Sequence, residues 1–182
     1  MAANLREPLL LAACRVLGKR GAKGLTLDAV AAEAKASKGG VLYHFRSKNA
    51  LFEALLKTLI DDFEREVDGF LKVEPDAPGR FVRAYIRASC REETPEEAEM
   101  GSALLAAVAS DPSWARVYWP AMERWRARAI DDGLDEPTAL ALLVAADGFS
   151  LCNSLGVGEA RKIVREEIVK KLIEWSDPTR RH

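Results

Sequence analysis

The residues best suited to chemistry lie close together in the segment SKGGVLYHFRSKNAL, Ser37 to Leu51. Its apolar spacing predicts a helix, yet Gly39 and Gly40 stand side by side near the start, where each costs roughly 1 kcal/mol relative to alanine. Missing side chains in a first turn let the backbone approach a phosphate or base edge next to the positive end of the helix dipole. Lysine, tyrosine and histidine can bind the same groups. The segment therefore predicts a surface for nucleic acid.

Two short helices and a tight turn are predicted around this segment. Thr26 is expected to cap a helix from Leu27 to about Ala34, and Ser37 to cap a second one from Lys38 to His44. A bracing helix from about Arg6 to Arg20 precedes them. This order is that of a helix-turn-helix unit, whose second short helix enters the DNA major groove.

The second short helix divides into two expected faces. The inward set is Val41, Leu42 and Phe45, and the outward set is Lys38, Tyr43 and His44. Ser47 is expected to cap a long helix from Lys48 to about Lys72, roughly 37 Å in length, and Lys48 adds charge at the same surface. An alternative is that Tyr43 and His44 only cover the core of the head. No partner for His44 stands at metal-ligand spacing, so no metal site is predicted.

The charges are divided unevenly along the chain. Residues 1–60 hold ten lysines and arginines against four acidic residues, whereas residues 61–182 hold seventeen against twenty-four. The formal net charge of −1 therefore conceals a basic head on an acidic body. Such a distribution attracts phosphate with one end only, although a basic stretch can also be an ordinary solvated face.

The run LTLDAVAAEAKASKGGVLYHFRSKNAL, from Leu25 to Leu51, resembles the DNA-binding domain of the TetR family of bacterial transcription regulators. The matching positions are Thr26, Val30, Ala31, Ala34, Ser37, Gly39, Leu42, Tyr43, Phe45, Lys48 and Leu51. In one departure Lys35-Ala36 replaces the family's usual Gly-Val, so that Lys35 either takes a costly left-handed conformation or shifts the turn. The predicted DNA-contacting residues are Thr26, Lys35, Ser37, Lys38, Gly39, Gly40, Tyr43, His44 and Lys48.

The remainder of the chain also predicts helices and no strands. Breaks at proline and glycine separate expected helices at about Gly79–Glu93, Glu96–Ser110, Ser113–Asp132, Glu136–Leu155 and Glu159–Ser176. The expected fold is all-α, with a three-helix DNA-binding head at residues 1–47 and a helical body at residues 48–182, joined by the long helix of about 48–72.

The resemblance implies a dimer whose body binds a small-molecule effector, with repression as the default. Small residues in about 136–155 and an apolar face in about 159–175, which includes Ile163, independently favour a four-helix interface between two subunits. Aromatic residues suggest a pocket for an apolar or aromatic effector in the body. The candidates are Phe63, Phe81, Tyr85, Trp114, Tyr118, Trp119, Trp125, Asp147 and Phe149.

Other functions find less support in the sequence. An enzyme needs a constellation such as paired carboxylates or Glu-x-x-His, and the run EETPEEAE is better interpreted as a solvated helix start, so no catalytic residue or cofactor is predicted. Three dispersed cysteines and the lack of a long apolar run favour a reduced, cytoplasmic protein without a membrane span. The remaining alternative is a helical small-molecule-binding or interaction module without DNA binding.

Overall fold

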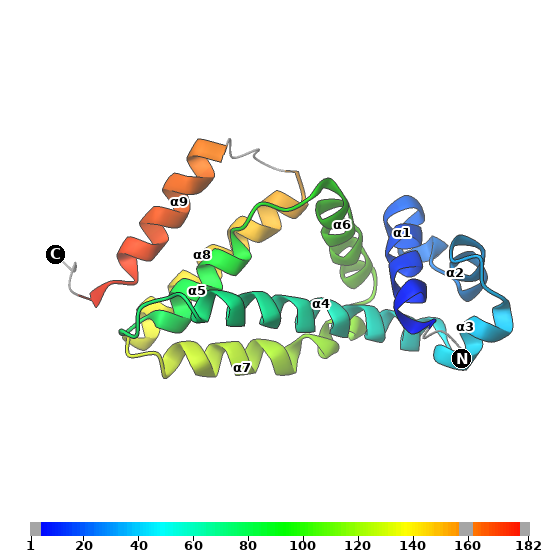
Figure 1. The fold of residues 1–182 in the computed structure, drawn as a ribbon, viewed down its shortest axis with the longest axis horizontal. Helices are drawn as coiled ribbons and strands as arrows, with labels where there is room; N and C mark the ends of the chain where they lie inside the picture. Colours follow the sequence, from blue (N-terminus) through cyan, green and yellow to red (C-terminus); the bar gives the residue numbers. More distant parts are fainter. Residues whose placement is uncertain (1–4, 157–161, 179–182) are drawn as a thin grey trace. The chain divides into compact units, whose positions relative to one another are not determined.

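The computed structural model describes residues 5–156 and 162–178, and these residues form helices without a strand (Figure 1), which confirms the all-α expectation. By their contacts the residues divide into two compact units. The first comprises the described residues of 1–60 and 94–118, and the second comprises those of 61–93 and 119–182. The chain passes between the units three times: within a long helix at residues 60–61, between residues 93 and 94, and between residues 118 and 119.

The first unit is built on the N-terminal helix. Helix α1 (Arg6–Gly24) packs against α2 (Leu27–Glu33) and α6 (Pro95–Ser110), and α2 packs against α3 (Lys38–His44). The start of α4 (Lys48–Leu71) and the 3-10 helix η1 (Pro112–Val117) complete the unit. Its core contains the fully buried side chains of Leu9, Leu17, Leu25, Val30, Val41, Leu51 and Phe52.

The helix starts of the first unit are fixed by three side-chain caps. The hydroxyl of Thr26 accepts a hydrogen bond from the Ala29 amide at 3.1 Å. The hydroxyl of Ser37 accepts a hydrogen bond from the Gly40 amide at the start of α3. The hydroxyl of Ser47 accepts one from the Ala50 amide at the start of α4, and both distances are 3.1 Å. Such a cap contributes about 1 kcal/mol relative to alanine. The sequence predicted all three caps, and the start and end of α3 agree with the prediction.

The second unit surrounds α5 (Arg80–Ser89), which packs against α8 (Glu136–Ser154), α9 (Lys162–Trp175) and α7 (Trp119–Ile130). Nearly all of α5 is buried. The carboxylate of Asp132 accepts hydrogen bonds from the amides of Phe81 at 2.9 Å and Val82 at 2.8 Å, so the start of α5 is capped from the turn that follows α7. Gly79 precedes this start with φ of 82°, a left-handed conformation that favours glycine.

Three predicted helices differ from those observed. The helix expected to end at about Arg20 continues to Gly24, although Gly21, with a φ of 64°, interrupts its helical conformation. The expected helix Ser113–Asp132 is divided into η1 and α7 because Pro120 lacks an amide hydrogen and its ring clashes with the preceding turn. The expected helix Gly79–Glu93 ends at Ser89, since Glu92 and Glu93 would meet the negative end of the helix dipole. The helix predicted from Glu159 is observed from Lys162, and its expected start lies outside the described residues.

Candidate nucleic-acid interface and ligand cavity

The outward surface of α3 combines exposed polar and aromatic groups. The side chain of Tyr43 is 83% exposed, and its ring contacts only that of His44, edge to face at a centroid distance of 5.1 Å, among the described rings. Val41 and Phe45 are buried, as predicted. Leu42 is 40% exposed, so the prediction that it turns inward is wrong. Val41 and Phe45 define the buried stripe of α3. Leu42 is turned about 100° from Val41 around the helix, so it lies beside this stripe and not within it.

The backbone conformation of α3 does not require glycine at either position 39 or position 40. Neither has a positive φ. A β-carbon added to Gly39 would meet only the Ser37 hydroxyl at 4.0 Å, and one added to Gly40 would meet the same oxygen at 3.3 Å. Alanine at position 39 would therefore fit the isolated chain. The missing side chain leaves an exposed patch of backbone at the helix start, which is open to close approach by another molecule.

The turn between α2 and α3 places a lysine where glycine is usual. Lys35 has a φ of 53°. The Ala36 amide donates to the Ala31 carbonyl at 2.9 Å and the Lys35 amide to the Ala32 carbonyl at 3.3 Å, the paired bonds of a Schellman helix end. Of the two outcomes predicted for Lys35, the left-handed conformation is the one observed, at a cost of about 1–2 kcal/mol. Its side chain is exposed.

The two lysines that flank α3 differ in their surroundings. Lys38 forms an exposed ion pair with Asp28 at 2.9 Å, which contributes little to stability and leaves the ammonium accessible. Lys48 is half-buried, because its ammonium donates to the Ala22 carbonyl and lies 5.9 Å from the centroid of the Trp114 ring. Lys48 thus helps to hold the first unit together, a role that the sequence did not reveal.

The aromatic residues predicted to bind a ligand do not form one group. Trp114 stacks on Phe52 at a centroid distance of 3.7 Å in the core of the first unit, where Tyr118 also packs. Trp119 is 60% exposed and Phe149 half-buried. Only part of the set meets in the second unit, namely Phe63, Phe81, Tyr85 and Trp125, with centroid distances of 5.0–6.0 Å.

Asp147 joins this aromatic cluster through a hydrogen bond. The Tyr85 hydroxyl donates to its carboxylate at 2.7 Å. Burial raises the pKa of Asp147 above its ordinary value, and the bond from Tyr85 opposes that shift. A single hydrogen bond thus compensates only part of the cost of holding this carboxylate among aromatic rings.

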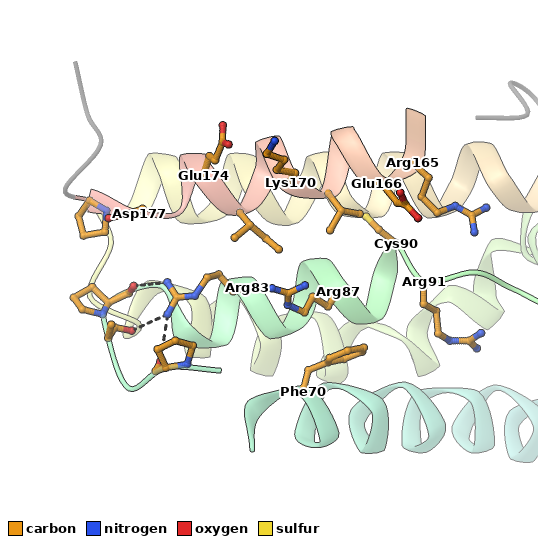
Figure 2. A pocket seen from close by; sticks show the side chains of 16 residues that line it. Phe70, Arg83, Arg87, Cys90, Arg91, Arg165, Glu166, Lys170, Glu174 and Asp177 are labelled. Atoms are coloured by element: carbon orange, nitrogen blue, oxygen red, sulfur yellow. Dashed lines mark hydrogen bonds between the residues drawn. The ribbon is translucent and has the colours of Figure 1, made fainter. Parts of the chain in front are cut away.

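A separate cavity of about 850 Å³ lies in the second unit, between α5, α9, the end of α4 and the loop that follows it (Figure 2). None of the nine predicted ligand residues lines it. Its lining joins apolar side chains with five cationic ones: Arg83, Arg87, Arg91, Arg165 and Lys170. The spacing of the first three, four residues apart, was visible in the sequence as one helical stripe.

Helix α8 leaves a row of small and apolar residues exposed. They recur with helical spacing and include Val144 (69% exposed), Leu151 (43%) and Leu155 (53%), together with Ala141, Ala145, Gly148 and Cys152. A β-carbon on Gly148 would meet nothing within 4 Å. On α9, Val164 and Trp175 are also exposed, at 47% and 61%, whereas the side chain of Ile163 lies outside the described residues.

Two features are absent from the described residues. Residues 5–156 and 162–178 contain no helix with the length and apolar character that a membrane crossing requires. The same part of the chain contains no group of three or more histidine, cysteine or acidic side chains placed to hold a metal ion.

Comparison with known proteins agrees with this arrangement. Residues 9–55 match the model of the bacterial regulatory proteins of the TetR family, and residues 79–177 match that of the tetracyclin repressor-like C-terminal domain. The two models together cover most of the chain, so the protein belongs to the TetR family. It is a DNA-binding transcriptional regulator with a C-terminal ligand-binding domain.

Solved structures share the fold over nearly the whole chain. A candidate transcriptional regulator from Pseudomonas aeruginosa PAO1 gives a TM-score of 0.78 at 22% identity, over 96% of this chain and 89% of that one. A transcriptional regulator from Rhodococcus sp. Rha1 gives 0.75 at 24% identity, over 92% and 93%. The multidrug binding protein EbrR, complexed with malachite green, gives 0.69 at 27% identity, over 93% and 98%.

Proposed function

We propose that the protein is a ligand-responsive repressor that binds a palindromic operator as a homodimer, with α3 in the major groove. The observation that carries this proposal is the surface of α3. There Gly39, which neither the packing nor the backbone conformation of the chain requires, lies one helical turn from Tyr43, whose side chain is 83% exposed. A large exposed aromatic beside open backbone has no role in the stability of the isolated chain, and both features suit a phosphate backbone.

The proposed contacts divide by chemistry. Gly39 and Gly40 allow the backbone to approach the duplex, Tyr43 and His44 bind phosphate oxygens, and Lys38 reaches a base edge or phosphate. Lys35 projects from the preceding turn toward the same backbone. Thr26, Ser37 and Lys48 act mainly through position, since their side chains already bind protein groups. The proposed DNA-binding domain is residues 1–47, with α4 as its connection to an effector domain of residues 48–182.

We propose that α8 and α9 form the dimer interface. The exposed row on α8 has the small residues that let two helices approach closely, and its apolar side chains otherwise face water. A twofold dimer requires an operator with half-sites roughly 34 Å apart, or a multiple of that distance. Because the cysteines that the structure describes are free thiols, a reduced cytoplasmic compartment suits the protein.

The proposed effector is an apolar or aromatic small molecule; the structural neighbour EbrR, a multidrug binding protein, was solved in complex with malachite green. The aromatic cluster of the second unit, with Asp147, is the proposed contact set. Ligand binding would shift α4 and change the spacing of the two DNA-binding heads. A change from 1:99 to 99:1 between two states requires a preference of about 5.5 kcal/mol. A true effector should change operator affinity and melting temperature together, and a change in melting alone would contradict the coupling.

Salt dependence of binding to a random-sequence duplex tests the DNA-binding surface. Affinity should fall by about 10³ or more between 50 and 200 mM salt if several phosphates are contacted. Tyr43→Phe, which removes only a hydroxyl, should weaken binding to every sequence, and Lys38→Ala should lower the salt slope by about one. Lys57→Ala, an exposed lysine on α4, is the charge-matched control. Equal losses in Lys38→Ala and Lys57→Ala would indicate general charge attraction and contradict the assigned surface.

A further inference from the structure

The cations around the cavity of the second unit are not equally neutralised. Arg83 is fully occupied, because it donates to Glu74 at 3.1 Å and to the carbonyls of Pro78, Pro75 and Ala77 (Figure 2). Its side chain holds the loop between α4 and α5. Arg87 shares the same buried carboxylate of Glu74, so one negative charge there serves two positive ones.

Arg165, on the opposite wall, has no such compensation. Its Nε is buried and has no hydrogen-bond acceptor among the described residues, and no ion pair joins Arg165 to a carboxylate in that part of the chain. The guanidinium lies near Cys90, whose pKa burial raises to about 12, so that this thiol stays neutral and supplies no counter-charge. A half-buried guanidinium without a partner is costly unless an anion joins it.

The wall next to Arg165 contains an apolar strip between charged side chains. Val169 and Ile173 follow Arg165 on α9 at spacings of four and eight residues, so they lie on the same side of the helix, and Phe70 of α4 also lines the cavity. Figure 2 shows Arg165 of α9 and Cys90, which follows α5, at the same end of the cavity. The volume of about 850 Å³ is that of a site for a drug-sized molecule. A cation at one end and an apolar strip beyond it favour an amphipathic ligand.

We infer that this cavity is a binding site for a small amphipathic anion, whose carboxylate or phosphate pairs with Arg165 while its apolar body lies along Val169 and Ile173. The site is distinct from the aromatic cluster proposed for the effector, and its existence does not depend on DNA binding. Three acidic residues also line the cavity and weaken its attraction for an anion, namely Glu166, Glu174 and Asp177, whereas Arg87 on the facing helix strengthens it.

A matched ligand series tests the inference by isothermal titration calorimetry of the full chain without DNA. The probes are 4-phenylbutyrate and 4-phenylbutan-1-ol, which share an apolar body and differ in charge. The acid should bind about tenfold or more tightly than the alcohol, the gain expected from a charge-assisted hydrogen bond. Inorganic phosphate should not compete at the same concentration, since it lacks the apolar body. Absence of acid binding, or equal binding of acid and alcohol, would overturn the inference.

Three variants locate the site. Arg165→Gln should abolish the preference for the acid without lowering the melting temperature, since no partner is lost. Glu166→Gln should strengthen acid binding by several-fold. Arg124→Gln makes the same charge change on α7, where neither Arg124 nor its ion-pair partner Glu64 lines the cavity, and should leave acid binding unchanged. If Arg165→Gln and Arg124→Gln weaken acid binding equally, the attraction is non-specific and the cavity is not the site. Because no DNA is present, failure here leaves the proposed operator binding untouched.

Discussion

The substitution Gly39→Ala separates a structural role of α3 from a DNA-binding role. Within the chain the new methyl group would meet only the Ser37 hydroxyl, at 4.0 Å, so it fits without rearrangement. Alanine in place of glycine stabilises a helix by up to about 1 kcal/mol. For a chain of this size that gain raises the melting temperature by roughly 2–4 °C. The methyl group would nevertheless stand between the backbone and a phosphate, so we expect DNA affinity to fall by about tenfold, equivalent to roughly 1.4 kcal/mol.

The assay pairs differential scanning fluorimetry with fluorescence anisotropy on a labelled duplex at 50 mM salt. Gly69→Ala is the matched control, because Gly69 lies in α4 with nothing within 4 Å of its added β-carbon. The control should gain stability and keep its DNA affinity. If Gly39→Ala is more stable and binds DNA as well as the unaltered protein does, the glycine has no role in close approach and the reasoning fails.

Further predictions concern the turn, the dimer and the buried carboxylate. Lys35→Gly should stabilise the protein by about 1 kcal/mol in thermal melts, because it relieves the left-handed lysine, and should lower the salt slope of DNA binding by about one if Lys35 meets a phosphate. Gly148→Arg should yield monomers in analytical ultracentrifugation with little change in the stability of the fold, whereas Gly69→Arg should not; a dimeric Gly148→Arg protein would rule out α8 as the interface. Asp147→Asn should raise stability at neutral pH. Because the folded-state pKa of Asp147 is raised, the unaltered protein loses stability as the pH rises from 3.8 through that pKa. The advantage of Asp147→Asn in pH-dependent denaturation should therefore vanish toward acid pH, and an advantage independent of pH would contradict this explanation.

Local signals made the DNA-binding part of the fold predictable. Capping by Thr26, Ser37 and Ser47 depends on residues adjacent in sequence, and the structure contains each cap. For Lys35 the local pattern left two outcomes, a left-handed conformation or a shifted turn, and the structure has the first. Pro120 is a local signal for the break between η1 and α7. The helical spacing of the surrounding aromatic residues obscured that signal.

Interactions between distant residues were less accessible. The bond from Lys48 to the Ala22 carbonyl spans 26 positions, and the pairing of Tyr85 with Asp147 spans 62. Aromatic composition alone could not separate Trp114, in the core of the first unit, from Trp125 in the cluster of the second. The cationic cavity was missed for the same reason, because the sequence does not show that the buried Nε of Arg165 has no hydrogen-bond acceptor among the described residues.

Selection of bound fragments from a random DNA pool tests the central claim most directly, because it reports binding, symmetry and spacing at once. The account predicts enriched fragments that contain two inverted half-sites, with centres roughly 34 Å or a multiple of that distance apart. Enrichment should be lost when Gly39 and Tyr43 are both replaced by bulkier and apolar residues that preserve the fold. A purified, folded protein that retains no fragment at low ionic strength, or that enriches sequences without twofold symmetry, would contradict it.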